Sequence, residues 1–383
     1  LEARRHNFLA AYSEVRESAA LAWADISTGE FRVMPSSLTR LGPDLARIAP
    51  RELLLSEARE QEIVSNMAET GISVTPLARG SFDSTNAERR LCDLFHVATL
   101  DAFAEAGGTF LDSADIYSRW VRGHGGGEAE RMVGRWMAAR GNRNRMVVAT
   151  KVRGRMWPGP AGEGLGREHI VKSCEASLKR LGVETIDLYQ CHWADDSVPM
   201  EETLRAFEEL IAAGKVRAIG ASNHDVDELR EALNEAETLG LPVFASLQPH
   251  YNLVHRGEFE GELQELCLDR RLAGLPYSPP AEGVLTGEDS EGAKPSGARA
   301  NGVREYQTAS GWATVACLRE IAARRGTTPA VVAVAWLLAR PGVTAPIIGA
   351  NSPAQLAEVL PAATLALTSE EVAELDEVST PRA

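Results

Sequence analysis

A regular alternation of short apolar strands and amphipathic helices constrains the fold of this chain most strongly. Seven segments are strand-like: residues 109–112, 146–151, 185–192, 216–221, 243–248, 273–277 and 344–349. Helical stretches with apolar residues at three- and four-residue spacing run between them, over 168–181, 200–213, 226–239 and 258–270. Such alternation predicts an α/β fold with a parallel sheet, and seven units of it favour a barrel over an open sheet.

The first 98 residues follow a different pattern. Strand-like segments 21–26 and 30–34 flank Ser27-Thr28-Gly29, which predicts an antiparallel hairpin. Helix-like stretches follow over 43–49 and 57–70. We therefore expect two domains, 1–98 and 99–383.

Composition excludes several classes of function. The net charge is −14, and neither residues 1–99, with 11 basic and 14 acidic residues, nor the remainder, with 29 and 40, offers a basic surface for nucleic acid. The longest apolar run, 331–339, is far shorter than the roughly 18 residues of a membrane span, and no basic and then apolar leader opens the chain. We expect a cytoplasmic protein without membrane contact. Its first residue is Leu, which suggests that the sequence starts inside a longer protein.

Metal binding, disulfides and a dinucleotide fingerprint are not indicated. The five cysteines form no C-x-x-C pair and no His cluster has metal-ligand spacing, so we expect reduced, mostly buried thiols. The glycine run at 123–127 matches G-x-G-x-x-G poorly and is interpreted as a loop. Residues 287–311, rich in Gly, Ser and Ala, are predicted to form a surface loop over one barrel mouth.

Polar residues stand at the C-terminal ends of the predicted strands, where a barrel of this kind gathers its chemistry. Each one alone has an ordinary explanation, such as an Asp that caps a helix or a His within a core. Together, at the ends of successive strands, they indicate a site. These residues are Asp112 with Tyr117, Lys151, His192, Ser222 with Asn223, and Gln248.

Several motifs resemble the aldo-keto reductases, in that family's order and spacing, over residues 98 to 375. The matching segments are TFLDSADIY at 109–117, ATK at 149–151, IDLYQCH at 186–192, GKVRAIGASN at 214–223, Gln248, and YSP at 277–279. The resemblance implies a (β/α)8 TIM-type barrel that reduces the carbonyl of a small aldehyde or ketone. It also implies a catalytic set of Asp112, Tyr117, Lys151 and His192.

This catalytic set is chemically reasonable. A carbonyl that accepts a hydride gains negative charge on oxygen, so a proton donor is needed there. A tyrosine hydroxyl has a pKa near 10 and is a poor acid–base group unless a cation favours its phenolate. We expect Lys151 to be that cation, Asp112 to hold the lysine, His192 to orient the carbonyl and Tyr117 to act as the general acid.

The resemblance implies NADP or NAD as cofactor. The carboxamide of the nicotinamide would bind Ser222, Asn223 and Gln248, with Tyr277 stacked on its ring. The other implied cofactor positions are Ser278 and, in the adenosine phosphate region at a helix N-terminus, Gly349, Asn351 and Gln355.

Four departures from the family pattern stand out. Asn351 replaces a common Arg, so a bidentate clamp on a 2′-phosphate is missing. Residues 280–282 are Pro-Ala-Glu where the family has Leu followed by Ala-Gly-Gly. Arg271 replaces a helix-ending Gly, and Gly274 replaces an aliphatic strand residue; both are predicted to be locally unfavourable.

The front segment resembles the connector domain of the MutS mismatch-repair proteins, an α/β domain related to the ribonuclease H fold. The matching segments are RRHNFLA at 4–10, LAWADISTGEFRV at 21–33, PRELLL at 50–55 and residues 82–103. The chain contains no G-x-x-x-x-G-K-[ST] motif, so such a connector would be an interaction module without catalysis.

Strand counting predicts that the barrel lacks its first strand. Eight units close such a barrel, whereas seven strands are found, and residues 99–106 resemble the end of the first crossover helix. The loss would remove about three inward side chains, each worth about 1.5 to 3 kcal/mol, which rivals the stability of a whole domain. Insertion of residues 21–26 into the gap would compete with their hairpin pairing.

Three interpretations remain open: an active oxidoreductase with an appended segment, a connector fragment with an incidental tail, and a non-functional fusion. We favour the first, because it covers more residues and contains the reactive set.

Overall fold

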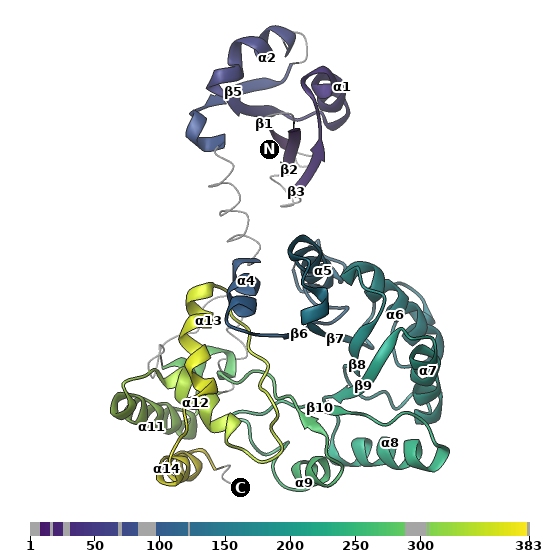
Figure 1. Cartoon of the computed structure of the whole chain (residues 1–383), viewed down its shortest axis with the longest axis vertical. Helices are drawn as coiled ribbons and strands as arrows, with labels where there is room; N and C mark the ends of the chain where they lie inside the picture. The colour runs from purple at the N-terminus through teal and green to yellow at the C-terminus, as the bar shows by residue number, and fades with distance from the viewer. Residues whose placement is uncertain are drawn as a thin grey trace. The chain divides into compact units, whose positions relative to one another are not determined.

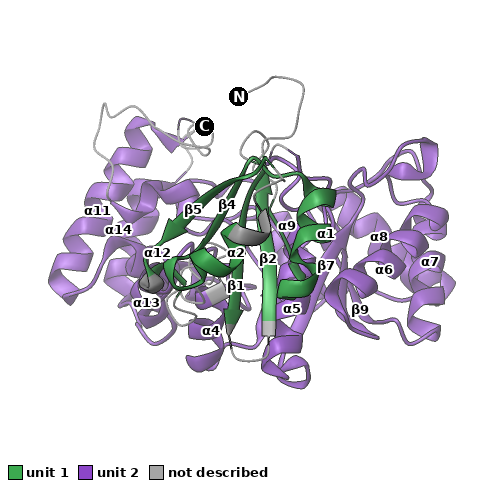
Figure 2. Ribbon diagram, turned by 90° about the horizontal axis from the view of Figure 1, so that it is seen from above, with its two compact units in different colours: residues 1–96 green, residues 97–383 purple. Residues whose placement is uncertain are grey.

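The computed structural model describes residues 8–15, 18–25, 31–67, 71–82, 97–121, 123–287, 304 and 306–380. The chain divides into two compact units, Leu1–His96 and Val97–Ala383, coloured separately in Figure 2. Within the described residues, no helix combines the length and the apolar character needed to cross a membrane.

Unit 1 is built on a mixed five-stranded sheet in the order β3-β2-β1-β4-β5. Its strands are β1 (Phe8–Val15), β2 (Ser18–Asp25), β3 (Phe31–Pro35), β4 (Glu52–Ser56) and β5 (Ser73–Leu77). The first three pair antiparallel, whereas β4 and β5 run parallel to β1. Its helices are α1 (Leu38–Ile48) and α2 (Glu60–Met67), with the short 3-10 helices η1 (Glu57–Arg59) and η2 (Arg79–Phe82). A separate apolar core that includes Leu21, Leu45 and Leu53 holds these layers together.

The predicted hairpin is confirmed by the antiparallel pairing of β2 with β3, from Ala20 opposite Pro35 to Ala24 opposite Phe31. Its turn, 26–30, lies outside the described residues. Because β2 pairs with β1 on one edge and with β3 on the other, it has no free edge with which to fill a gap in another sheet.

Unit 2 contains a parallel six-stranded sheet in the order β11-β10-β9-β8-β7-β6, which curls into part of a barrel with helices along its outside (Figure 1). The strands are β6 (Phe110–Asp112), β7 (Val147–Val152), β8 (Ile186–Cys191), β9 (Val216–Ser222), β10 (Ser246–Gln248) and β11 (Ala273–Gly274). The predicted α/β class and parallel sheet are therefore confirmed, and the sheet is consistent with the predicted barrel. Strands β10 and β11 are shorter than predicted.

The helices of unit 2 follow from the apolar spacing. In α6, Ile170, Cys174 and Leu178 are buried at four-residue spacing, and the helix ends at Gly182 in the left-handed conformation. The helices are α4 (Val97–Glu105), α5 (Glu128–Arg140), α6 (Arg167–Leu181), α7 (Met200–Ala212), α8 (Val226–Leu239), α9 (Glu262–Asp269), α11 (Ala309–Arg325), α12 (Pro329–Leu338), α13 (Pro353–Val359) and α14 (Ser369–Ser379). Short 3-10 helices are η3 (Arg143–Arg145), η4 (Pro160–Gly162), η5 (Ala281–Thr286) and η6 (Leu360–Ala363).

The predicted strand at 344–349 is wrong. This segment is extended and lies beside β11, with one parallel bridge between Val343 and Gly274. Its backbone donates from Thr344 to the Gly274 oxygen and from Ile347 to the Pro276 oxygen, each at 2.8 Å. A regular ladder cannot continue, because residues 276 and 346 are both Pro and have no N–H to donate.

The predicted loop at 287–311 lies largely outside the described residues. Its last three residues belong to α11, which begins at Ala309. This part of the prediction is wrong.

The two ends of the curled sheet are β6 and the extended segment 343–347. Among the described strands, β6 pairs with β7 alone. Phe110 from β6 and Ile347 from the other end pack against the same buried cluster of Ala149, Leu188 and Leu275. Helix α4 packs against both α5 and α13. Apolar contacts inside the sheet and α4 outside it therefore support the curl where strand pairing stops.

The expected disadvantage of Gly274 is also wrong. A Cβ built on this residue would lie 2.1 Å from the carbonyl oxygen of Gly342. Glycine therefore permits the close backbone approach that brings the segment beginning at Val343 next to β11.

Arg271, by contrast, adopts the left-handed conformation at φ 55° just after α9, where its Cβ is unfavourable. We predict that Arg271→Gly raises the free energy of unfolding by about 1 kcal/mol, because the exposed side chain is replaced by a residue without a Cβ. Thermal and denaturant unfolding measure the change. Arg271→Ala is the matched control and should give no comparable gain, since it keeps the Cβ. Equal stability of the Gly and Ala variants would contradict the explanation.

Candidate functional site

A fully buried lysine organises the ends of β6 and β7. The Lys151 Nζ donates to Asp112 Oδ2 at 2.5 Å, to the Ser113 carbonyl oxygen at 2.9 Å and to the Tyr117 hydroxyl at 3.1 Å. An ammonium group has three protons and no acceptor, so the Tyr117 oxygen must be the acceptor in this contact. The Tyr117 proton is therefore left to be donated elsewhere.

The second oxygen of Asp112 is held by two glutamine amides. Its Oδ1 accepts from the Gln248 Nε2 at 2.9 Å and from the Gln190 Nε2 at 3.3 Å. Sequence analysis did not single out Gln190. The signal was available, because Gln190 stands two residues before His192 and side chains two apart on a strand share a face.

Burial controls the acidity of Tyr117. It raises the pKa of the Tyr117 hydroxyl above the usual 10, although the Lys151 ammonium acts in the opposite direction. Lys151 favours the phenolate, as expected, but burial outweighs it, so the net shift of the Tyr117 pKa is upward. At neutral pH Tyr117 keeps its proton, which is the state required of a donor.

The pKa values of Lys151 and His192 shift in opposite directions. Burial lowers the pKa of Lys151, but Asp112 and Tyr117 outweigh it and the net shift is upward. Burial, with Lys151 and Arg153 nearby, lowers the pKa of His192 to about 3. The neutral His192 ring stacks on Trp193 at 3.8 Å and meets the Tyr117 ring edge-on at 5.8 Å between centroids. Its Nδ1 is buried and has no hydrogen-bond partner among the described residues.

Four of the implied nicotinamide-binding residues lie together, three of them at the ends of β9 and β10 and Tyr277 just after β11. The Ser222 hydroxyl donates to the Gln248 backbone oxygen at 2.9 Å, and the Asn223 Nδ2 donates to the His192 backbone oxygen at 2.9 Å. The Tyr277 hydroxyl donates to the Asn223 Oδ1 at 2.8 Å. Asn223 adopts φ 54°, a strained conformation of the kind found at binding sites.

The implied phosphate-binding residues lie on the surface. Gly349, Asn351 and Gln355 are all exposed. The Asn351 N–H donates to the Gln355 Oε1 at 2.9 Å, and the Gln355 N–H donates to the Ser352 Oγ, which caps α13. Residues 345–359 contain no Lys or Arg. Ser278 adopts φ 55°, and its backbone oxygen accepts from the Asn252 Nδ2 at 3.0 Å.

A second buried polar cluster lies on the other face of β7. The fully buried Glu130 accepts from the Thr150 Oγ1 at 2.7 Å and from the Arg180 Nε at 2.5 Å. Burial, followed by the charge of Glu130, raises the pKa of Asp115 to about 8. Neither Asp115 side-chain oxygen has a hydrogen-bond partner among the described residues. Sequence analysis missed this cluster, in which Asp115 is neutral at pH 7.

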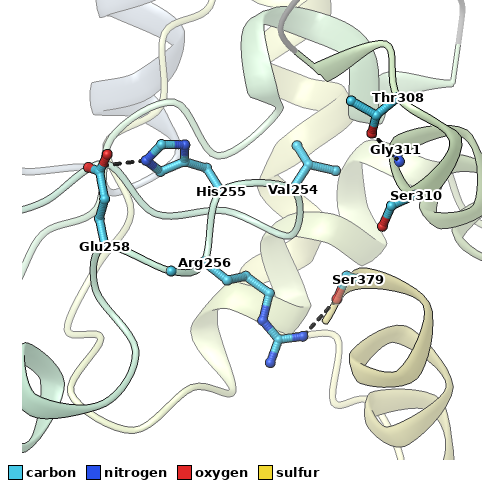
Figure 3. Close-up of a pocket in the computed structure, with 9 residues that line it drawn as sticks. Val254, His255, Arg256, Glu258, Thr308, Ser310, Gly311 and Ser379 are labelled. Carbon is cyan, nitrogen blue, oxygen red and sulfur yellow. Dashed lines mark hydrogen bonds and ion pairs between the residues drawn. The ribbon is translucent and has the colours of Figure 1, made fainter. Parts of the chain in front are cut away.

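A pocket of about 410 Å³ lies between the loop 254–258 and the ends of α11 and α14. Figure 3 shows Arg256 in this pocket reaching Ser379, and the distance between Arg256 Nη1 and Ser379 Oγ is 2.7 Å. The same guanidinium pairs with Glu260 at 2.9 Å and with Asp376 at 3.2 Å. Because its charge is already balanced, Arg256 fastens α14 to the loop and does not offer an anion site.

Metal and thiol chemistry can be assessed for the described part of the chain. No group of three or more His, Cys, Asp or Glu there could hold a metal ion. Cys174, Cys191 and Cys267 are buried and free, and Cys317 is free and partly buried. Cys92 lies outside the described residues.

Comparison with known proteins supports both predicted resemblances. Residues 58–380 match the aldo/keto reductase family. The "Probable voltage-gated potassium channel subunit beta" of Arabidopsis thaliana is 31% identical over 303 residues, covering 76% of this chain and 88% of that protein. The DNA mismatch repair protein MutS of Cereibacter sphaeroides is 36% identical over 292 residues, covering 66% of this chain, and that of Ruegeria sp. is 58% identical over 111 residues, covering 29%. The chain spans only 32% and 12% of the lengths of these two MutS proteins.

The family match begins within unit 1, at residue 58. Residues 73–77 form β5, which pairs with β4 in the sheet of unit 1. The unit that contains the curled sheet therefore begins at Val97 and not at residue 58.

The Asp115 shift predicts a dependence of stability on pH. An unfolded Asp loses its proton near pH 3.8, whereas Asp115 in the folded chain keeps its proton up to about pH 8. Its contribution to stability is therefore lost as the pH rises through this interval. We predict that Asp115→Asn is more stable than the wild type at pH 8 by at least about 1 kcal/mol, with a smaller difference near pH 5. Denaturant unfolding at both pH values measures this, with Asp196→Asn on an exposed loop as control. A difference that does not grow with pH would contradict the assignment.

Proposed function

Because this chain belongs to the aldo/keto reductase family, we propose that its second unit reduces the carbonyl of a small aldehyde or ketone to an alcohol, with NADP or NAD as the hydride source. One observation carries the proposal. The buried Lys151 donates its three protons to Asp112, Ser113 and Tyr117. Because the Tyr117 oxygen is an acceptor in this contact, the Tyr117 proton is available to a substrate oxygen.

The residues divide the proton chemistry between them. A dinucleotide held there would be the source of the hydride that the carbonyl carbon accepts. Tyr117 donates a hydrogen bond to the carbonyl oxygen and transfers its proton as negative charge develops there. Lys151 stabilises the phenolate that remains, and Asp112 keeps the lysine charged and in place. The neutral His192 orients the carbonyl, and water returns a proton to Tyr117.

The polar groups at the ends of β9 and β10 fit a nicotinamide. Ser222, Asn223 and Gln248 offer a hydroxyl and two amides, which complement a primary carboxamide. Tyr277, fixed by its bond to Asn223, would stack on the ring, with Ser278 beside it.

We assign Gly349, Asn351 and Gln355 to the phosphate half of the dinucleotide. The absence of a basic residue from 345–359 removes a charged partner for a 2′-phosphate. Without such a partner, this segment gives NADP no charge-based advantage over NAD.

Tyr117→Phe tests this function. We predict a fall in kcat of about 10²- to 10⁴-fold, the usual contribution of a general acid, with cofactor affinity changed by less than about twofold. Loss of reduced-nicotinamide absorbance measures turnover, and cofactor fluorescence measures binding. Tyr251→Phe, which removes another buried hydroxyl bonded to Glu260, is the matched control and should keep its turnover. Turnover retained in Tyr117→Phe would refute the assignment.

We also propose that the barrel lacks the strand that would lie between β6 and the segment 343–347. Two observations support this. β6 pairs with β7 alone among the described strands, and Phe110 and Ile347 at the two ends are only partly buried. Helix α4 occupies the place of a first crossover helix, since it packs on both α5 and α13.

Completing the barrel should therefore stabilise it. We predict that exchanging residues 1–96 for the first strand of an intact family member raises the thermal midpoint and the cofactor affinity. About three inward side chains of 1.5 to 3 kcal/mol each would be added to the core. Removal of residues 1–96 without replacement is the control and should give neither gain. If the completed chain matches the original in both measurements, the proposal fails.

A second function is favoured for the N-terminal part of the chain, because the chain is 58% identical to a MutS protein over 111 residues. We propose that residues 1–98 form a domain separate from 99–383, related to the ribonuclease H fold, and that this domain is an interaction module without catalysis. Binding of a mismatch-repair protein to this domain would support its role as an interaction module. Absence of both binding and carbonyl reduction would instead support a non-functional fusion.

A further inference from the structure

We infer that Gln190 is a positioning residue that holds the Asp112 carboxylate in the orientation required by Lys151 and Tyr117. The inference rests on the proposed carbonyl reduction, because it concerns the same proton donor. Gln190 lies on β8 and is fully buried, and its Nε2 donates to Asp112 Oδ1 at 3.3 Å.

The two oxygens of Asp112 have separate tasks. Oδ2 receives the Lys151 ammonium at 2.5 Å, while Oδ1 receives the amides of Gln248 and Gln190 at 2.9 and 3.3 Å. A carboxylate is flat and can rotate about the bond to its Cβ. Donors on Oδ1 therefore decide where Oδ2 points, and so where the lysine lies.

The restraint matters because β6 is short and lies at one end of the sheet. It contains three residues and pairs with β7 alone among the described strands. Its backbone is thus weakly anchored near Asp112. The two amides reach the carboxylate from β8 and β10, across the inside of the curled sheet, and supply the restraint that a second neighbouring strand would give.

Gln248 is proposed to bind the cofactor as well as Asp112, whereas Gln190 is proposed to bind Asp112 alone. The proposed carboxamide site includes Gln248, so the amide of Gln248 is shared between Asp112 and the cofactor. Gln190 is assigned no contact with the cofactor. It is therefore the donor that can remain on Asp112 throughout the reaction.

A purely structural role fits Gln190 poorly. Its Oε1 is buried and has no hydrogen-bond partner among the described residues. A buried polar atom without a partner lowers stability, and an apolar residue of similar size would avoid that loss. The hydrogen bond from Nε2 to the Asp112 carboxylate therefore accounts for an amide at this position.

Gln190→Leu separates the two roles. We expect kcat to fall about tenfold, KM and cofactor affinity to change by less than about twofold, and the thermal midpoint to stay the same or rise. A fall in the thermal midpoint together with kcat would assign Gln190 a structural role and overturn the inference. So would an unchanged kcat.

Thr150→Val is the matched control for burial. Thr150 is also a fully buried side-chain donor, on the neighbouring strand β7, but its hydroxyl serves Glu130. We expect this variant to lose thermal stability and keep kcat, which is the reverse of the Gln190→Leu result. Equal responses of the two variants would overturn the inference.

Gln190→Glu provides a pH readout that a structural role would not produce. A carboxyl group at this position can donate to Asp112 only while it is protonated, and burial beside Asp112 raises its pKa above the ordinary value. The kcat of this variant should therefore be near that of the wild type at low pH and should fall as the pH rises through the new pKa. The wild type should show no such fall, and a variant with the wild-type pH profile would overturn the inference.

Failure of this inference differs from failure of the proposed function. If Tyr117→Phe is inactive while both Gln190 variants behave like the wild type, only the role of Gln190 is refuted. If Tyr117→Phe retains turnover, the proposed function itself is refuted.

Discussion

The ion pair between Lys151 and Asp112 is the interaction on which the site depends. Both side chains are almost completely buried, and their oxygen and nitrogen atoms are 2.5 Å apart. Removing one partner of such a pair typically costs about 3 to 5 kcal/mol, because the other charge is left buried without compensation. The pair joins the ends of β6 and β7 and fixes the contact by which the Lys151 ammonium reaches the Tyr117 hydroxyl. The proton donation proposed for Tyr117 thus depends on the same ion pair that joins β6 to β7.

Two consecutive residues of β7 serve two different buried clusters. Lys151 faces the inside of the curled sheet, whereas Thr150 faces outward to Glu130 and Arg180. This division follows from the alternation of side chains along a strand. The outer cluster contains one cation and two acids, and it is electrically neutral because burial keeps Asp115 protonated near pH 7. Residues 112–117 contribute Asp112 and Tyr117 to the inner cluster, where both bond to Lys151, and Asp115 to the outer one.

The sheet of unit 2 is curled although its described strands do not form a closed ring. Strand pairing ends at β6 and at the segment 343–347, yet Phe110 and Ile347 meet the same apolar cluster inside. The helical layer bridges the two ends through α4. Unit 1 has its own core and its own paired strands.

The sequence by itself determined the α/β class, the parallel sheet, the hairpin of β2 and β3, and the meeting of Asp112, Tyr117 and Lys151. Those features follow from local periodicity, and from the rule that parallel strands end at one edge. Tertiary structure alone decided the rest. Pro276 and Pro346 stop the last ladder, and Gly274 is required by the distant Gly342 backbone. Gln190 acts across the sheet, and burial outweighs Lys151 in setting the acidity of Tyr117. Burial and cross-sheet contacts depend on residues far apart in the chain. A local pattern could place Gln190 on the same face as His192, but it could not reveal that the Gln190 amide bonds to Asp112.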